Sequence, residues 1–153
     1  MDLILWRHAD ALDPDADQHD VDRELSAKGE RQAARMAKWL DRQLPDGARI
    51  FSSPAKRAVQ TVGFLGRKYK IRDELSPQCD HTHVLSLVQW PAAKMPTLVV
   101  GHQPALGQTM AELLGVPELA LSMRKGSVWW LRSKLSDGWA KTVLVTVQAP
   151  EMM

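Results

Sequence analysis

The chain has 153 residues, of which 44% are hydrophobic, so it can bury one substantial core and gives no reason to expect a second. We therefore expect a single domain over residues 1–153. The formal charge of +2 comes from basic residues interspersed with acids, which argues against nucleic acid as a partner. The first apolar run, residues 3–6, is too short for a signal peptide or a membrane span, so we expect a cytoplasmic protein that does not bind membranes. The single cysteine excludes an intrachain disulfide.

Three strand-to-helix units follow one another along the chain. The first joins a strand at residues 3–6 to a helix at residues 27–44, for which Ser26 is the expected N-cap. The second joins a strand at residues 49–51 to a helix for which Ser53 is the expected N-cap and the following proline the first helical residue.

The third unit joins a strand at residues 97–100 to a helix with Pro104 in its first turn and Gly115 as its C-cap. Between the second and third units we expect a short strand at residues 71–72 and a short helix at residues 82–90.

Two strands are expected at the end of the chain, residues 127–132 and 142–148. The Asp-Gly pair within residues 136–138 favours a turn between them. The alternation of strands and helices predicts an α/β layer fold around a largely parallel sheet.

Histidine and arginine recur at the carboxyl ends of the predicted strands, where an open α/β sheet binds its ligands. Arg7 and His8 end the first strand, Arg57 lies in the first turn of the helix after the second, and His102 follows the third. Arginine offers a planar fork of donors to phosphate oxygens, and histidine can form a phosphoramidate. The four residues predict a phosphoryl site in which His8 and His102 act as nucleophile and clamp.

Two other interpretations of these residues remain open. His8, His102 and Asp10 could form a zinc or iron site, although two neighbouring guanidinium groups would repel a cation. A non-catalytic module that only binds phosphate is the other possibility; it would not need a nucleophile at position 8.

Four motifs in order give the chain a resemblance to the histidine phosphatase superfamily, whose members include phosphoglycerate mutases, acid phosphatases and the short SixA-type phosphohistidine phosphatases. The motifs are Leu5-Trp6-Arg7-His8-Ala9, Leu25-Ser26-Ala27-Lys28-Gly29, Ser52-Ser53-Pro54-Ala55-Lys56-Arg57-Ala58-Val59-Gln60-Thr61 and Val100-Gly101-His102-Gln103-Pro104. The resemblance implies a three-layer α/β/α sandwich of the phosphoglycerate mutase type, with a mostly parallel sheet and an antiparallel edge, and a metal-independent phosphatase without a cofactor.

By the same resemblance His8 is the nucleophile, while Arg7, Arg57 and His102 hold the phosphoryl oxygens. Arg23 is similar to a further phosphate-binding arginine of the short members.

The position at which mutases and sugar phosphatases carry a glutamate as general acid holds Pro77 here. An alkoxide leaves poorly without a proton, whereas the imidazole of a phosphohistidine leaves more readily. Asp80 could supply the proton, or it could cap the helix that follows it. We therefore expect a phosphohistidine protein phosphatase that acts on a signalling or phosphotransfer protein, such as a histidine-phosphotransfer domain; the alternative is a phosphomonoesterase for a small phosphorylated metabolite.

Two further groups of possible metal ligands are weaker. Residues 13–24 carry acids at four positions of a calcium loop, but Gln18 stands where such a loop needs glycine, so a solvated loop bordering the site is expected. The Cys, Asp and His residues at positions 79–83 lack a second ligand pair downstream.

Overall fold

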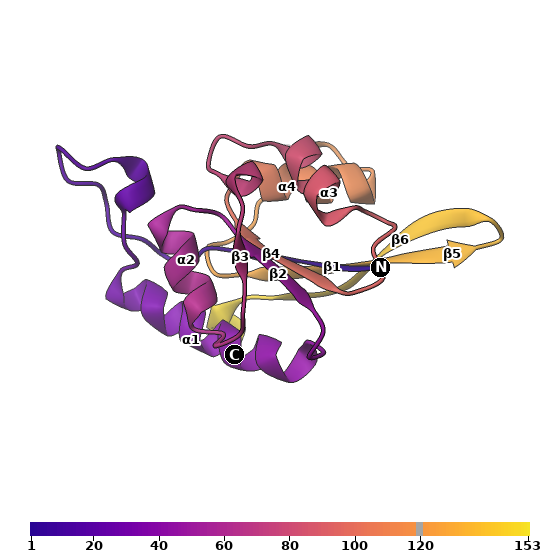
Figure 1. The fold of residues 1–153 in the computed structure, drawn as a ribbon, viewed down its shortest axis with the longest axis horizontal. Coiled ribbons are helices and arrows are strands. Elements are labelled where there is room, and N and C mark those ends of the chain that lie inside the picture. Colours follow the sequence, from indigo (N-terminus) through magenta and orange to yellow (C-terminus); the bar gives the residue numbers. More distant parts are fainter. Residues whose placement is uncertain (119–120) are drawn as a thin grey trace.

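The computed structural model describes residues 1–118 and 121–153 and has a six-stranded sheet at its centre (Figure 1). The strands lie in the order β3-β2-β4-β1-β5-β6. Their bounds are β1 (Asp2–Arg7), β2 (Arg49–Ser52), β3 (Lys70–Ile71), β4 (Thr97–Gly101), β5 (Val128–Ser136) and β6 (Trp139–Gln148). The first four strands run parallel, and β5 and β6 add an antiparallel edge. The mostly parallel sheet is therefore confirmed.

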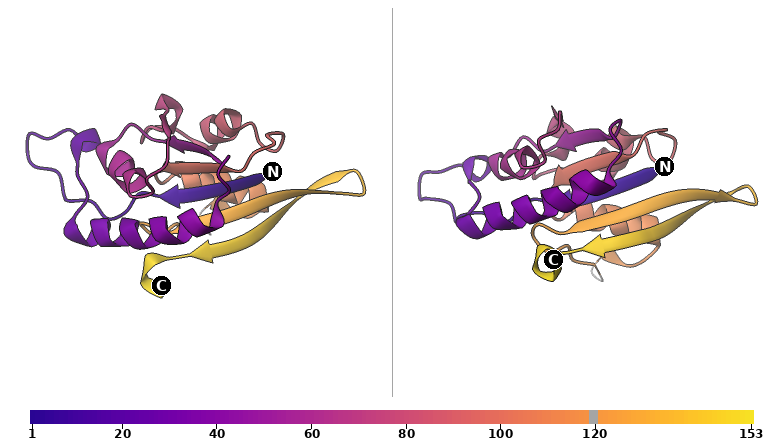
Figure 2. Two further views of the ribbon diagram at one scale, coloured as in Figure 1. Left: turned by 60° about the horizontal axis from the view of Figure 1, so that its bottom comes forward. Right: turned by 90° about the horizontal axis from the view of Figure 1, so that it is seen from below.

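Helices cover both faces of this sheet. The long helices are α1 (Ala27–Gln43), α2 (Lys56–Gly63), α3 (His81–Val88) and α4 (Ala105–Leu114). Helices α1 and α2 lie on one face, and α3 and α4 lie on the other (Figures 1 and 2). The three-layer α/β/α arrangement is thus confirmed, while the single domain over residues 1–153 stays a prediction. No helix in the described part of the chain is both long and apolar enough to cross a bilayer.

Strand β1 contributes to the core on both of its faces, because successive strand side chains point to opposite sides. Ile4 and Trp6 pack with residues of α1 and α2, whereas Leu3 and Leu5 pack with residues of α3 and α4. All four side chains are fully buried. Burial on both faces fixes the register of β1 and with it the position at which the chain leaves the sheet.

Some predicted boundaries differ from the structure. Helix α2 begins at Lys56, and its N-cap residue Ala55 makes no side-chain capping bond, so Ser53 is not the cap. Strand β3 lies one residue earlier than predicted, and α3 is shorter. Pro104 is the N-cap residue of α4 rather than a first-turn residue, and Gly115 is confirmed as its C-cap at φ 67°.

The hairpin at the end of the chain is longer than predicted. Strands β5 and β6 stay paired as far as Ser136 and Trp139, and the predicted turn at Asp137 and Gly138 uses two positive φ angles, 52° and 82°. The outer half projects beyond the body of the protein (Figure 2). Its side chains are solvated on both faces, so the apolar alternation that marks a half-buried strand is missing there.

Helix α1 packs closely against the backbone that leaves β1, and Gly29 makes this possible. A Cβ atom on Gly29 would lie 1.9 Å from the carbonyl oxygen of Asp10. That oxygen also accepts a hydrogen bond from the backbone N–H of Ser26, the N-cap of α1. The absence of a side chain at position 29 therefore sets the path of the chain just after the predicted site.

We expect Gly29→Ala to lower the free energy of unfolding by about 2 kcal/mol through overpacking, although glycine to alanine inside a helix normally adds about 1 kcal/mol. Gly63→Ala in α2 is the matched control, because no heavy atom lies within 4 Å of its added Cβ. Urea denaturation of both variants gives the comparison. A Gly29→Ala protein as stable as the parent would contradict the close approach.

Candidate active site

The structure brings together the four residues predicted to form the phosphoryl site. Arg7 is the last residue of β1 and pairs in register with Gly101 at the end of β4, so His8 and His102 leave neighbouring strands. Their ring centroids are 5.0 Å apart. Arg57, in the first turn of α2, places its Nε atom 3.4 Å from Nε2 of His8.

The backbone at His8 is held from three sides. Its N–H donates to the carbonyl of Gly101 (3.0 Å), and its carbonyl accepts from the N–H of Gly126 (3.0 Å). The N–H of the next residue, Ala9, donates to Oγ1 of Thr61 in α2 (3.1 Å). These bonds tie His8 to β4, to the chain before β5 and to α2, so its position is fixed before any ligand arrives.

The geometry of the His8 ring determines which nitrogen is free to react. Nδ1 lies 2.8 Å from the carbonyl oxygen of Ala9, and a carbonyl only accepts, so Nδ1 carries the proton. In the neutral ring Nε2 therefore keeps its lone pair. Burial is the main cause that lowers the pKa of His8 to about 3; the bond to Ala9 opposes this shift, while His102 and the two arginines add to it, so the ring is neutral at pH 7.

His102 is held by Ser53, which the sequence analysis predicted to be a helix N-cap. Its Nε2 lies 2.7 Å from Oγ of Ser53, and the backbone N–H of Ala55 donates a hydrogen bond to the same Oγ. Burial, and then the charge of Arg57, lowers the pKa of His102 to about 3. Its Nδ1 is buried and has no hydrogen-bond partner among the described residues. In the sequence, the only indication of this contact was a serine next to the end of a strand, and a serine at that place is equally typical of an N-cap.

In the guanidinium group of Arg7, Nη1 makes a hydrogen bond and Nε makes none among the described residues. Its Nη1 donates to the carbonyl of Met123 (2.6 Å), whereas Nε is buried without a partner in the described chain. Burial and the charge of Arg57 lower the pKa of Arg7 below its ordinary value. Nε of Arg7 is thus a buried donor that no group of the described chain satisfies.

Asp20 is a site residue that the sequence analysis missed. Arg57 donates from Nη1 to the carbonyl oxygen of Asp20 (2.9 Å) and from Nη2 to its Oδ2 (3.0 Å). Burial raises the pKa of Asp20, but the bonds from Arg23 and Arg57 lower it more, so the net shift is downward. The residue belongs to the acidic loop expected to border the site, and that border position is confirmed. Its only signal was an acid three residues before Arg23.

Arg23 meets the site indirectly. Its Nη1 donates to Oδ1 of Asp20 (3.1 Å) and its Nε donates to the carbonyl of Leu12 (2.9 Å). In this structure Arg23 supports Asp20, which in turn holds Arg57, and the phosphate contact expected for Arg23 stays a prediction.

Asp80 is the N-cap of α3, as the sequence allowed. It accepts the backbone N–H groups of Thr82 and His83, and its own backbone N–H donates to Nδ1 of the His83 ring, which completes a capping box. The bonds from Thr82 and His83 lower the pKa of Asp80 to about 2, although desolvation opposes them. An ionised carboxylate with these partners gives no support to a proton-donor role.

The possible metal ligands are not gathered around the two histidines. The carboxylate of Asp10 accepts from Oγ of Ser26 (2.6 Å) and pairs with Nζ of Lys125 (3.2 Å). Among the described residues, no three His, Cys, Asp or Glu side chains are arranged to hold a metal ion. Two neutral imidazoles and two guanidinium groups instead make the pocket cationic, which suits a dianion such as a phosphoryl group.

We expect acid to destabilise the protein through these two histidines. Their pKa in the folded protein is about 3, below the ordinary 6.5, so the unfolded chain binds protons first as the pH falls. The free energy of unfolding should therefore fall below pH 6.5, by about 1 kcal/mol per pH unit for each histidine.

Denaturation of the parent and of His102→Asn between pH 7 and pH 4.5 measures this slope, which the variant should roughly halve. His19→Asn, an exposed histidine outside the pocket, is the control and should leave the slope unchanged. Equal slopes in all three proteins would show that the buried rings do not control the acid sensitivity.

Comparison with known proteins agrees with this geometry. The model of the histidine phosphatase superfamily (branch 1) matches residues 3–80, which include three of the four converging residues. An uncharacterised protein of Picosynechococcus sp. is 33% identical over 142 residues, which are 87% of this chain and 86% of the relative.

Solved SixA structures have the same fold over almost the whole chain. A SixA protein from Nakamurella multipartitia superposes with a TM-score of 0.78 at 27% identity, over 97% of this chain and 95% of that one. The protein histidine phosphatase SixA in complex with tungstate gives 0.76 at 25% identity, over 99% of each chain. A SixA protein from Agrobacterium tumefaciens gives 0.81 at 24% identity, over 97% of each chain, and supports the fold. The chain therefore belongs to branch 1 of the histidine phosphatase superfamily and is a phosphatase of the SixA type.

Proposed function

We propose that this phosphatase hydrolyses phosphohistidine on a protein, through a covalent phosphoryl group on Nε2 of His8. The observation that carries the proposal is the bond from Nδ1 of His8 to the carbonyl of Ala9, which leaves the Nε2 lone pair beside Arg57. A ring held in this tautomer needs no base to become a nucleophile.

In the first step Nε2 of His8 attacks phosphorus, and the bond between phosphorus and the substrate's imidazole breaks. The substrate ring already carries a proton on its other nitrogen, so it leaves as neutral imidazole. His8 becomes a phosphorylated imidazolium that keeps its Nδ1 proton on the Ala9 carbonyl. In the second step water attacks phosphorus, His8 leaves as the neutral ring, and dihydrogen phosphate carries both protons of the water.

Neither step needs a separate general acid. When a phosphoryl group passes from one imidazole to another, the attacking and the leaving group have similar basicity. An alkoxide leaving group, by contrast, would require a proton. Pro77 stands where other members carry a glutamate, and Asp80 is ionised and engaged in the cap of α3. These features favour a phosphoramidate over a phosphomonoester.

Three residues have assigned roles toward the phosphoryl oxygens in this proposal. Arg7 offers its unpartnered Nε, Arg57 stands beside the attacking nitrogen, and His102 offers Nδ1 as a donor when Ser53 donates to its Nε2. Together they neutralise the charge that spreads over the equatorial oxygens in the transition state. The substrate would be a cytoplasmic signalling or phosphotransfer protein, such as a histidine-phosphotransfer domain.

Trapping the intermediate tests the mechanism. Brief incubation with a ³²P-labelled phosphohistidine protein and quenching in alkali should leave acid-labile label on the phosphatase, and peptide mapping should place it on His8. His8→Ala should lose the label and lower turnover by more than about 10³-fold. Label on another residue, or label that survives in His8→Ala, would exclude the proposed nucleophile.

The substrate class is tested separately on the unmodified protein. We expect kcat/KM for a phosphohistidine protein to exceed that for a panel of sugar phosphates, phosphoserine and 3-phosphoglycerate by at least about 10²-fold, since these leave as alkoxides. Turnover of one monoester at the rate of the phosphohistidine protein would make the chain a small-molecule phosphomonoesterase. Anion binding with no turnover of any substrate would make it a phosphate-recognition module.

Asp20→Asn tests how the anion pocket is supported. We expect the variant to bind tungstate about fivefold more weakly, because it loses an ion pair that holds Arg57 and such a pair with one exposed partner contributes about 1 kcal/mol. Asp22→Asn removes the same charge from the same loop and is the control, since Asp22 has no side-chain bond to Arg57 among the described contacts. Calorimetric titration compares the three proteins. Tighter binding by Asp20→Asn would mean that the carboxylate competes with the anion instead of positioning Arg57.

A further inference from the structure

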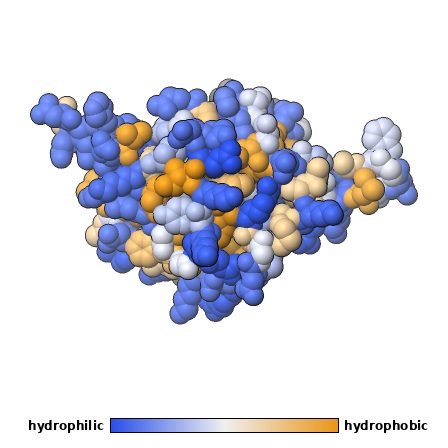
Figure 3. Space-filling model, viewed as in Figure 1, coloured by the Kyte–Doolittle hydropathy of each residue, from blue (hydrophilic) through white to orange (hydrophobic). Residues whose placement is uncertain are grey.

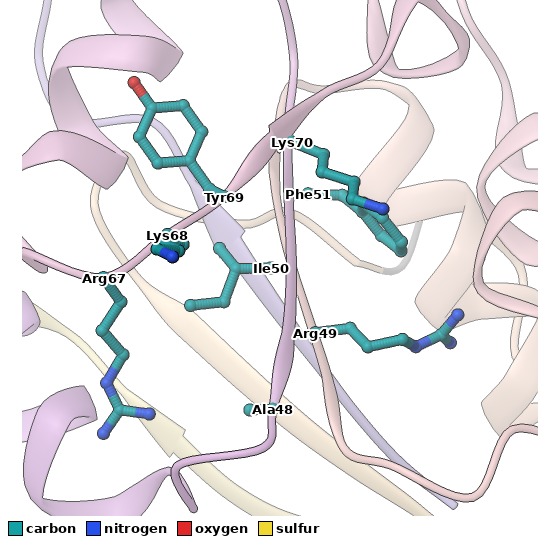
Figure 4. Close-up of a pocket in the computed structure, with 8 residues that line it drawn as sticks. All are labelled: Ala48, Arg49, Ile50, Phe51, Arg67, Lys68, Tyr69 and Lys70. Carbon is teal, nitrogen blue, oxygen red and sulfur yellow. The ribbon is translucent and has the colours of Figure 1, made fainter.

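The hollow of about 600 Å³ at the outer edge of the sheet is lined by residues 48–51 and 67–70 (Figure 4). Ile50 and Phe51 are only 4% and 7% exposed, so their apolar side chains belong to the core and offer a ligand little surface. On the face seen in Figure 3, strongly hydrophilic groups interrupt the apolar surface in the middle of the protein. More specific contacts, each with a defined donor and acceptor, surround the backbone that follows His8.

The peptide unit between Ala9 and Asp10 contains the carbonyl that holds the Nδ1 proton of His8. The N–H group of the same unit belongs to Asp10 and donates to Oε1 of Gln32, in α1 (2.9 Å). A trans peptide unit is planar, with its C=O and N–H groups pointing in opposite directions. The bond to Gln32 therefore also fixes the direction of the carbonyl that meets His8.

The two neighbouring peptide units are held by other groups. The backbone bonds at His8 fix the preceding unit, and the carbonyl of Asp10, in the following unit, accepts the N–H of Ser26 (3.0 Å). A unit between two fixed neighbours can still turn over as a plate, through opposite changes in ψ of Ala9 and φ of Asp10. Among the described contacts, only the His8 ring and Gln32 bond to this unit and resist its rotation.

Gln32 is itself held in the orientation that this bond requires. Its Nε2 donates to Oε1 of Glu151 (3.3 Å), in the turn Pro150–Met152, which lies against α1 (Figure 1). A backbone N–H only donates and a carboxylate only accepts, so an amide, with one acceptor and one donor end, satisfies both partners. Gln32 is only 7% exposed, so little solvent reaches it to replace either partner.

We propose that Gln32 is a positioning residue for the nucleophile: it holds the peptide unit after Ala9 so that the carbonyl keeps the ring proton on Nδ1 and leaves Nε2 of His8 free. Glu151 contributes by orienting the Gln32 amide. This role rests on the proposed function, in which Nε2 of His8 attacks phosphorus, whereas the position of the ring proton is measured without any substrate.

The measurement is ¹⁵N NMR at pH 7 of protein labelled in its histidine rings, with His8→Ala identifying the His8 signals. A protonated and an unprotonated ring nitrogen resonate far apart, so the two shifts give the ratio of the neutral tautomers. We expect the parent protein to have Nδ1 protonated and Nε2 unprotonated. Gln32→Met removes both hydrogen bonds at similar side-chain length and should move the ratio about fivefold toward the Nε2–H form, the change expected for one weakened hydrogen bond.

Gln108→Met is the matched control, because Gln108 makes the same pair of bonds elsewhere in the fold. Its Oε1 accepts the backbone N–H of His81 (3.3 Å), and its Nε2 donates to Oε1 of Glu118 (3.2 Å). This variant should leave the ratio at His8 as it is in the parent. An unchanged ratio in Gln32→Met, or an equal shift in both variants, would overturn the role of Gln32 and leave the nucleophile untouched.

Two exchange variants test the contribution of Glu151 and do not depend on the stability of Gln32→Met. Gln32→Glu alone brings two carboxylates together and should shift the ratio toward Nε2–H. In Gln32→Glu/Glu151→Gln the carboxylate at position 32 accepts from both the Asp10 N–H and the amide at position 151, so the ratio should return to that of the parent. A folded double variant that keeps the shift of Gln32→Glu would overturn the orienting role of Glu151. A parent protein with Nε2 protonated would instead contradict the nucleophile of the proposed function.

Discussion

The hydrogen bond between Nδ1 of His8 and the carbonyl oxygen of Ala9 is the interaction on which the proposed chemistry of this protein depends. Without it the neutral ring could carry its proton on either nitrogen, and part of the population would have a proton on Nε2, where the proposed nucleophile needs a lone pair. The bond removes this choice with a backbone group of the adjacent residue, whose position is itself fixed by Thr61. Tautomer control therefore follows from the path of the chain as it leaves β1.

That path is determined by packing on both faces of the sheet. Ile4 and Trp6 are buried on one side and Leu3 and Leu5 on the other, so a shift of β1 by one residue would move each pair into the wrong layer. The same register pairs Arg7 with Gly101. The hydrophobic core thus sets the distance between the two histidines, and core stability and site geometry depend on the same contacts.

The sequence predicted the parts of this architecture that depend on local pattern. Short apolar runs and helical spacing identified the parallel sheet, and strand ends identified Arg7, His8 and His102 because parallel strands end at one edge. The predictions were less accurate where a contact depends on residues far apart in the chain. Ser53 looked like an N-cap, since the local pattern cannot reveal that His102, which follows the neighbouring strand β4, lies beside it.

Asp20 shows that ion pairs between residues far apart in the chain are equally difficult to predict from the sequence. In the sequence it is one acid among several in a solvated loop, and only its position three residues before Arg23 distinguishes it from Asp22. In the fold Asp20 accepts two hydrogen bonds from Arg57 and one from Arg23. The two bonds from Arg57 offset the free-energy cost of burying its charged guanidinium group. Arg57 binds Asp20 through Nη1 and Nη2, so its Nε–H group remains directed at Nε2 of His8. The loop and the proposed nucleophile are therefore coupled through one arginine, and a movement of the loop would change the electrostatics at Nε2 of His8.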